Sequence, residues 1–367
     1  MEIYIFCVVA LTVFIVAHFF HVKKNGGSQD ARKSILVSGA ISVVVLVLII
    51  SIAYFSQVSD REIRNGKVVG KSKETVTCSH TYPCNCNKNG CSTCFQHLHD
   101  YDWVVKTNIP YNFTIDRVDS QGVLVPDRWA KVKIGDAVSD SFTYVNYIKG
   151  ANQSLFNKQL GDVDLKDVPA YPGTTYDYYH VNRVIGVGID VDPKWNHQLQ
   201  DMLSDLGPAY QINAVFVLTN KDENFNSALE YKWNGGKKND VVVVIHMDNE
   251  SKKISSAHVI SWTPNQLFKV ELRDSIVASD VFDYDRVLEI FNAQVKKNWV
   301  RMKMGDYKYL SADIDISITS IIVAFILSVI SYVACYMYIN HRNGVRVTLK
   351  KKFNSSSLHS RARRKFF

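Results

Sequence analysis

Three uninterrupted apolar runs constrain this 367-residue chain more than any other feature of its sequence. The runs are Ile3–Phe20, Ile35–Phe55 and Ile316–Ile339, and none of them contains Asp, Glu, Lys or Arg. At about 1.5 Å per residue each would form a helix of about 27–36 Å, which matches the hydrocarbon thickness of a bilayer. A buried core helix is seldom apolar over such a length. We therefore predict transmembrane helices over residues 1–20, 35–55 and 315–339.

The first run has the length of either a membrane anchor or a secretory signal peptide. A signal peptide carries positive charge before its apolar stretch, whereas this chain begins Met1-Glu2 and places its charges after the run. There is no small-x-small cleavage pattern near His18–His21. These flanks favour a helix that stays in the membrane.

Charge next to the runs predicts the orientation of the chain. Residues 21–34 hold four basic residues and one acidic residue, and residues 340–367 hold nine basic residues and no acidic one. Residues 56–314 hold 30 basic and 32 acidic residues, so the net charge of +8 belongs to the two short segments. The positive-inside rule therefore predicts a cytoplasmic loop over 21–34, a cytoplasmic tail over 340–367, and a periplasmic or extracellular region over 56–314.

This distribution argues against reading the basic balance as nucleic-acid binding, and no nucleic-acid partner is expected for the folded region. The tail is rich in Lys and Arg and contains the serine run Ser355–Ser357. Its chemistry favours a resting place on anionic lipid headgroups, with a polyanion or a protein in the cytoplasm as the alternative. The lipid bilayer is thus a predicted partner of the chain.

The exterior region begins with a polar, helix-compatible segment over 56–77, which we predict to be a stalk. A cysteine-rich unit with β-strands is predicted over 78–170 and an α/β domain over 171–310. The change in composition that separates them lies at Val168–Thr175.

The densest chemical signal lies between Cys78 and His99, where five of the seven cysteines and three of the eleven histidines occur. Two chemistries compete for it. A Cys-x-x-Cys turn at Cys91 and Cys94 suits a structural zinc site, completed by Cys84 and Cys86, by Cys78 or by a nearby histidine. An oxidising exterior favours disulfides instead, and five cysteines would then leave one thiol unpaired. Redox catalysis is a third alternative, although no thioredoxin-like strand precedes the pair.

After this cluster, three segments read as short strands, because β-branched and aromatic residues lie between turn signals. They are Asp102–Lys106, Phe113–Val118 and Trp129–Ile134. Trp103 and Trp129 fit either a core or a binding face, and core packing is the commoner use of such residues.

The second exterior unit alternates strands with helices, which predicts an α/β sandwich. Strands are predicted over Val184–Val191, Ile212–Leu218, Val241–Met247 and Ala257–Trp262. Helices are predicted from Asp192-Pro193 to Leu206, over Phe225–Asn234, after Thr263-Pro264 and over Tyr284–Arg301. The apolar run Val241–Met247 is typical of a strand that is covered on both faces.

Part of this unit resembles a known family. The helix ending in Lys232-Trp233-Asn234-Gly235, the polar turn Lys237–Asp240 and the strand that follows are similar to the TPM domain, over residues 180–305. The resemblance implies a TPM-like α/β sandwich, often followed by a spanning helix. Where that family has a Gly-x-Gly segment, this chain has Ser261-Trp262-Thr263. The N-terminal part, with the cysteine cluster and Trp129–Asp136, is similar to uncharacterised membrane proteins of large tailed phages and bacteria.

The sequence contains no Gly-x-Ser-x-Gly elbow, no His-Glu-x-x-His helix and no phosphate-binding glycine loop. The acidic group Asp280, Asp283 and Asp285 is the best calcium candidate, with capping of the following helix as the alternative. His246, Asp248 and His258 are a further set that could converge across neighbouring strands.

Two functions remain. The preferred one is a non-catalytic, membrane-anchored binding or scaffolding protein that engages another envelope protein. The alternative is a metal-dependent hydrolase of phosphatase type, which the TPM resemblance implies. Zinc is the one cofactor that the sequence suggests.

Overall fold

The structure is a computed structural model, and it describes residues 2–24, 28–88, 90–151 and 165–342, with side chains from residue 8 onward. Most of the predicted basic tail therefore lies outside the described residues. Contacts divide the chain into two compact units, one formed by Met1–Gln57 with Asp315–Phe367 and the other by Val58–Ile314. Both predicted exterior domains fall in the second unit.

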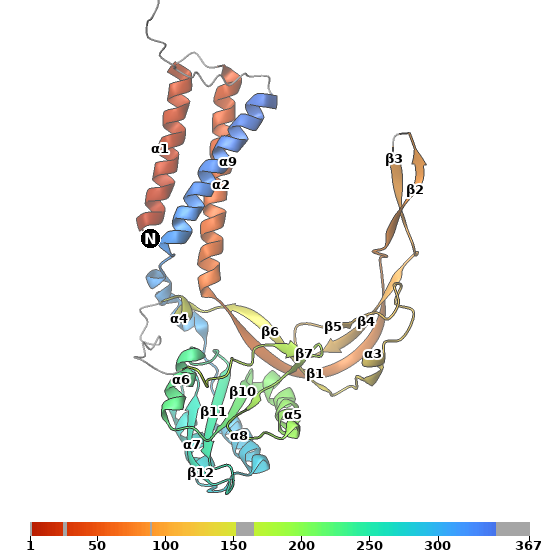
Figure 1. Cartoon of the computed structure of the whole chain (residues 1–367), viewed down its shortest axis with the longest axis vertical. Coiled ribbons are helices and arrows are strands. Elements are labelled where there is room, and N and C mark those ends of the chain that lie inside the picture. The colour runs from red at the N-terminus through yellow and green to blue at the C-terminus, as the bar shows by residue number, and fades with distance from the viewer. Residues whose placement is uncertain (1, 25–27, 89, 152–164, 343–367) are drawn as a thin grey trace, which may run out of the picture. The chain divides into compact units, whose positions relative to one another are not determined.

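The described part of the first unit consists of three apolar helices (Figure 1), α1 (Glu2–Lys24), α2 (Gln29–Val58) and α9 (Ile318–Arg342). Leu11, Leu46 and Ala324, one from each helix, are fully buried in a shared cluster. Many other apolar side chains point outward, among them Phe14, Leu48, Ile52 and Ile326. Such an apolar exterior is typical of helices that face lipid.

By length and composition, two helices in the described part of the chain could cross a membrane, α2 and α9, rather than the three predicted. The remaining predicted span, Ile3–Phe20 near the N-terminus, is also a helix in the structure, α1. The side chains of residues 2–7 lie outside the described part, so this span remains a prediction. Helix α2 is longer than expected, because the Ser28 hydroxyl accepts a hydrogen bond from the Ala31 amide at 3.1 Å and caps its first turn.

The second unit opens with the 18-residue strand β1 (Ser59–Val76), so the expectation of a helix-compatible stalk over 56–77 was wrong. β1 pairs antiparallel with β6 (Ala137–Val145) along its first half and with β4 (Asp100–Thr107) along its second half. With β5 (Phe113–Ile115) the sheet has the order β5-β4-β1-β6. Partners far away in the sequence satisfy the backbone of β1, and a polar sequence gives no local sign of them.

A small core lies on this sheet, with Val68, Trp103 and Ile115 at its centre. The strands expected at 102–106 and 113–118 are confirmed as β4 and β5. The strand expected at Trp129–Ile134 was wrong, because Asp127–Lys131 forms the short helix α3 after Pro126. Its Trp129 packs edge-on against Trp103, with ring centroids 4.7 Å apart, so these aromatic residues serve the core.

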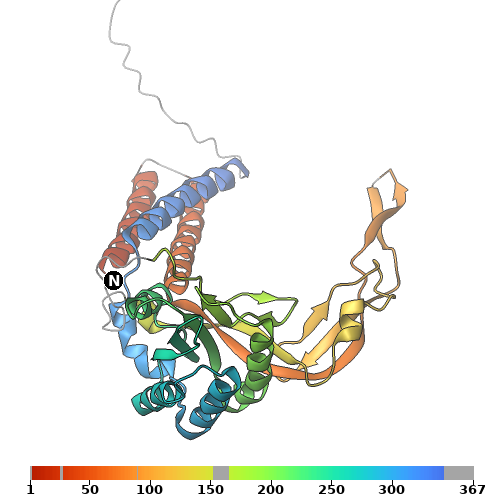
Figure 2. The same ribbon diagram turned by 60° about the horizontal axis from the view of Figure 1, so that its bottom comes forward.

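Residues 184–298 of the second unit form a four-stranded sheet with helices on both faces, so the predicted mixed α/β class is confirmed (Figure 2). The strand order is β12-β11-β10-β9. Strands β9 (Val184–Val187), β10 (Asn213–Thr219) and β11 (Asp240–Met247) are parallel, and β12 (Ile254–Ile260) is antiparallel to β11. Every residue of β11 is buried, as its apolar run predicts.

The helices α5 (Pro193–Tyr210), α7 (Gln266–Val277) and α8 (Tyr284–Asn298) pack on the sheet face that carries Phe216. Helix α6 (Asn224–Lys232) packs on the opposite face, against Val215. Because β9, β10 and β11 are added in one direction while α5 and α6 cover opposite faces, one of the two crossovers must be left-handed. Such a crossover is rare in parallel sheets.

Helix α5 runs to Tyr210 and so passes the predicted stop at Gly207-Pro208. Pro208 has no N–H to donate to the carbonyl four residues earlier, so the helix continues past it with one backbone hydrogen bond fewer, and Gly207 has a packing role. A Cβ at Gly207 would lie 2.4 Å from the backbone oxygen of Asn65 in β1. The glycine thus allows α5 to approach the first sheet closely.

A buried polar network joins the two sheets of the second unit. The guanidinium of Arg183, which is fully buried, donates hydrogen bonds to Asn213 at 2.9 Å, to Asn65 at 2.5 Å and to Ser139 at 2.7 Å. Asn213 in turn donates to the buried carboxylate of Asp240 at 2.9 Å. Burial lowers the pKa of Arg183 to about 10. This network links β1 and β6 to the starts of β10 and β11.

Candidate metal centre

A hairpin of two strands, β2 (Thr81–Asn87) and β3 (Gly90–Phe95), extends from the first sheet (Figures 1 and 2). None of the described residues of these strands is buried, and only Cys84 and Cys94 are half-buried. We call residues 81–95 the arm. A two-stranded hairpin without a core is marginal in water, so other interactions must hold the arm together.

Two disulfides provide these interactions. The structure pairs Cys84 with Cys94 and Cys86 with Cys91, so the second pair lies inside the loop closed by the first. Of the chemistries expected for these four residues, the disulfide alternative is the one that the structure has. The four sulfur atoms are thus not zinc ligands here, and the odd cysteine left over is Cys78.

Cys78 lies at the base of the arm with three other metal-ligand side chains, His80, His97 and Asp100. One ligand atom from each residue lies within 4.8 Å of the others. Cys78 and His80 come from the link between β1 and β2. His97 comes from the link between β3 and β4, and Asp100 is the first residue of β4. We call these four residues the base cluster, and by its residues it could hold a metal ion.

The distances within the base cluster suit one small ion. Cys78 Sγ lies 3.6 Å from His97 Nδ1, which lies 3.0 Å from Asp100 Oδ1, and His80 Nδ1 lies 3.4 Å from Asp100 Oδ2. Tetrahedral zinc with bonds of about 2.0 Å to nitrogen or oxygen and about 2.3 Å to sulfur places its ligands about 3.3–3.6 Å apart. His80 Nδ1 is also buried without a hydrogen bond in the described structure. The residue types therefore fit zinc, and these three distances lie near that spacing, while the ligand atoms as a set lie within 4.8 Å of one another.

The same geometry argues against a Cys-His-Asp catalytic triad. A triad histidine uses one ring nitrogen for the nucleophile and the other for the carboxylate, which lets it pass a proton between them. In the base cluster a single atom, His97 Nδ1, faces both Cys78 Sγ and Asp100 Oδ1. A metal site requires ligand atoms that converge on one point, whereas a proton relay requires contacts at two different ring nitrogens.

Asp100 is held ionised at the centre of the base cluster. Burial by itself raises the pKa of Asp100, but hydrogen bonds from Arg117 and His97 outweigh it and hold the pKa of this carboxyl well below its usual range. The Arg117 guanidinium donates to Asp100 at 2.9 Å and to Asp102 at 2.7 Å. Asp100 therefore carries negative charge at neutral pH and is oriented by a second layer of contacts, as metal-ligating carboxylates are.

The predicted calcium residues have separate contacts in the structure. Asp283 caps α8, because its side chain accepts a hydrogen bond from the Arg286 amide at 3.1 Å. Asp285 accepts from Gln198 at 2.8 Å, and an Asp280 oxygen lies 3.8 Å from Lys253 Nζ. The three carboxylates thus have separate partners, and the capping alternative explains Asp283.

The set His246, Asp248 and His258 also has separate contacts. Both ring nitrogens of His246 have partners in the protein at 2.9 Å, the Lys221 carbonyl and the Asn226 side chain. Asp248 accepts hydrogen bonds from Ser251. His258 lies on β12 opposite Val244 of the neighbouring strand. No free ligand atom of His246 is available for a metal.

No family model matches the chain, and neither a curated protein nor a solved structure matches it. The likeness to TPM domains and to phage membrane proteins therefore stays an expectation. Any functional conclusion has to rest on the base cluster, the arm and the surface of the folded unit.

Proposed function

We propose that the chain is a membrane-anchored, non-catalytic binding protein whose arm engages another protein of the cell envelope. The single observation that carries this proposal is that two disulfides stiffen a hairpin with no buried residue in its described part. Disulfides in a core would stabilise the fold, but these lie in a projecting element that contributes nothing to either core. Stiffening an exposed element lowers the entropy lost when it binds.

The arm and the link that follows it have the side chains of a contact surface. Tyr82 is 47% exposed, Phe95 is 56% exposed and Leu98 is 93% exposed. Aromatic and apolar residues on a rigid element are typical anchors of protein interfaces. A protein partner fits this surface better than a small molecule, which needs a concave site.

The proposed location is the periplasmic or extracellular side for residues 56–314, with three membrane helices and a cytoplasmic tail. The positive charges next to the apolar runs support this topology. The two disulfides support it independently, because such bonds persist in oxidising compartments. An α/β sandwich of TPM type is the finer proposal for the second sheet, supported by the alternation of strands and helices from β9 to α8.

The cofactor we assign to the base cluster is zinc, held by Cys78, His80, His97 and Asp100. Four protein ligands leave no open position for water, which is the pattern of a structural site rather than a catalytic one. The ion would tie the link before the arm to the link after it, and so fix the direction in which the arm points. The hydrolase alternative has no comparable support, since its acidic residues have separate partners.

Site-specific photocrosslinking in native membranes tests the binding role. A photoreactive residue at position 98 of the full chain should give a discrete protein adduct, because Leu98 is 93% exposed beside the arm. Position 134 is the matched control, since Ile134 is 72% exposed in the same unit but away from the arm. The adduct at 98 should weaken when Cys84→Ser and Cys94→Ser are added. Equal adducts at both positions, or none at 98, would count against the proposal.

Metal analysis of the full chain purified in detergent tests the zinc assignment. We expect one zinc per chain, lost in Cys78→Ala and retained in Cys84→Ser with Cys94→Ser. His99→Ala is the matched control, because His99 is a neighbouring histidine that contacts Tyr101 at 2.8 Å and lies outside the base cluster. Zinc that survives Cys78→Ala, or that disappears with the disulfide pair, would show that the assigned ligands are wrong.

A further inference from the structure

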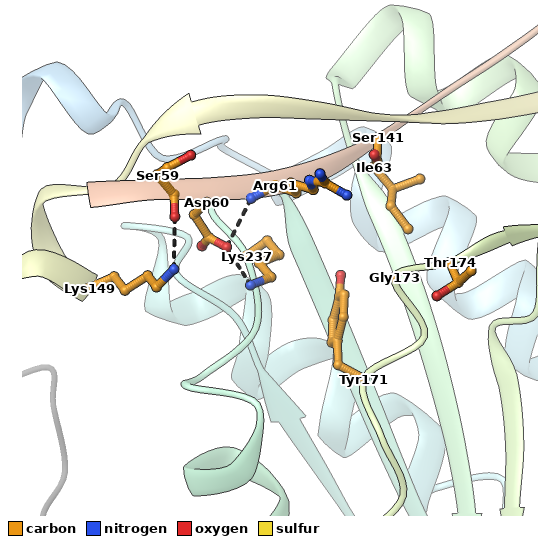
Figure 3. A pocket seen from close by; sticks show the side chains of 10 residues that line it. All are labelled: Ser59, Asp60, Arg61, Ile63, Ser141, Lys149, Tyr171, Gly173, Thr174 and Lys237. Carbon is orange, nitrogen blue, oxygen red and sulfur yellow. Dashed lines mark hydrogen bonds and ion pairs between the residues drawn. The ribbon is translucent and has the colours of Figure 1, made fainter. Parts of the chain in front are cut away.

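A pocket of about 440 Å³ lies between the start of β1 and the segment Tyr171–Thr174, apart from the arm and the base cluster (Figure 3). Ser59, Asp60 and Arg61 of β1 form one wall, and Lys149 and Lys237 approach from other elements. All of its lining residues belong to the second unit.

The pocket carries positive charge that the described residues do not neutralise. Lys237 Nζ lies 2.6 Å from Asp60 Oδ1, so these two charges balance each other. Lys149 Nζ donates to the neutral carbonyl of Ser59 at 2.8 Å and has no carboxylate partner in the described part of the chain. Arg61 is exposed, and its guanidinium makes no hydrogen bond among the described residues. Two cations thus remain for an anionic ligand.

Hydroxyl groups complete the lining. Ser141 and Thr174 both line the pocket and can donate hydrogen bonds to an oxygen ligand. Tyr171 is held differently, because its hydroxyl donates to the buried carboxylate of Asp240 at 2.7 Å. Guanidinium, ammonium and hydroxyl donors around one cavity are the groups that bind phosphate oxygens.

The place of the pocket along the chain points to a ligand source. Val58 and Ile314, the two ends of the second unit, meet at Gly150, where a Cβ would lie 2.9 Å from a Val58 methyl and 3.1 Å from an Ile314 methyl. Ser59 and Lys149 of the pocket are the chain neighbours of Val58 and Gly150. Helix α2 ends at Val58, and α9 begins at Ile318. Along the chain, α2 thus ends directly before Ser59 of the pocket, and α9 begins four residues after Ile314.

We propose that this pocket binds the phosphate group of an anionic phospholipid headgroup, with Arg61 and Lys149 as the charged contacts. Residues joined so closely to the ends of two spans are expected at the depth of the exterior headgroups, where Arg and Lys side chains can pair with a lipid phosphate. This proposal does not depend on the binding role of the arm or on zinc in the base cluster. The lipid site and the proposed function can therefore fail separately.

The test uses the full chain in lipid nanodiscs that contain a photoactivatable phosphatidylglycerol, with adducts mapped to peptides by mass spectrometry. We expect adducts on the peptides that hold Ser59–Arg61, Lys149 or Thr174, and at least a tenfold loss of these adducts in Arg61→Ala with Lys149→Ala. Lys194→Ala with Lys296→Ala removes the same charge from helices α5 and α8 and should leave the adducts unchanged. Arg61→Lys with Lys149→Arg keeps both charges and should keep most of the adducts.

Two further experiments distinguish a phosphate that belongs to a lipid from a phosphate in solution. A photoactivatable phosphatidylcholine should label these peptides weakly, because its headgroup has no net charge. If millimolar inorganic phosphate removes the adducts of the unchanged chain, the pocket is a phosphate site whose ligand comes from solution, and the lipid assignment is overturned. Equal labelling by both lipids, or labelling that survives Arg61→Ala with Lys149→Ala, would overturn the proposal.

Discussion

Removing the outer disulfide, by Cys84→Ser with Cys94→Ser in the full chain, should open the arm and leave both cores intact. The bond joins residues 10 positions apart, and closing such a loop stabilises it by about 2.7 kcal/mol in the chain-entropy account. The inner bond joins residues 5 positions apart and shortens the path around the outer loop to about six steps, which lowers that value to about 2.2 kcal/mol. No buried side chain in the described arm offsets the loss.

A change of about 2.2 kcal/mol corresponds to about a 40-fold larger opening constant for the arm. Hydrogen exchange of the full chain in detergent measures it directly, because amide exchange follows local opening. Amides over Thr81–Phe95 should exchange about 40-fold faster in the double variant, and amides of β11 should be unchanged. Cys335→Ser is the matched control, since Cys335 is a free cysteine outside the arm.

Unchanged exchange in the arm would refute this reasoning, since it would mean that contacts other than the disulfide hold the hairpin. Faster exchange of the β11 amides in the double variant would also refute this reasoning. That result would make the arm part of the cooperative core, and its proposed role as a separate contact element would fall.

Two further predictions concern the second unit. Lys237→Met should lower the free energy of unfolding by about 3 kcal/mol at pH 7, because it leaves the Asp60 carboxylate buried without its cation. Burial raises the pKa of Asp60, but the charge and hydrogen bond of Lys237 outweigh it and lower that pKa, so this pair stabilises the fold above about pH 4 and the gain is lost as pH falls further. Denaturant unfolding at pH 7 and at pH 3 should thus show a smaller acid loss in the variant, and equal losses would contradict the pairing. Gly207→Ala should lower the free energy of unfolding by about 1–3 kcal/mol, because its Cβ would lie 2.4 Å from the Asn65 carbonyl oxygen. Gly305→Ala is the control, since a Cβ there would have nothing within 4 Å and should leave the stability unchanged. Thermal unfolding of both variants measures the difference.

The parts of the fold that sequence could predict are those that local signals specify. Helix α5 begins at an Asp192 cap followed by proline, and α8 repeats apolar residues on one face. The apolar run of β11 needs no partner to be recognised. These elements confirm the predicted mixed α/β class, because each carries its own periodicity or cap.

Strand β1 could not be predicted in this way. Its residues are largely polar, and its hydrogen bonds go to β4 and β6, which begin 41 and 78 residues after its own start. The strand prediction for Trp129–Ile134 failed for the opposite reason. Aromatic and β-branched residues suggested a strand, whereas the helix α3 begins there after Pro126. Strand preference is a matter of neighbours more than of local sequence.

The candidate site was found only in part. The cysteine cluster was recognised, and the odd thiol was expected, but sequence does not decide which cysteines pair. Asp100 was missed, because a single carboxylate at the start of a strand is unremarkable until His97 and Cys78 face it. The spacings Cys78-x-His80 and His97-x-x-Asp100 were the only available sign.

The most direct test of the account is the side of the membrane on which the arm lies. In intact cells that express the full chain, a membrane-impermeant maleimide should label Leu98→Cys, whose position is 93% exposed. It should label Ser356→Cys, in the predicted cytoplasmic tail, only after permeabilisation. The opposite pattern would place the disulfides, the base cluster and the proposed binding surface in the cytoplasm and contradict the account.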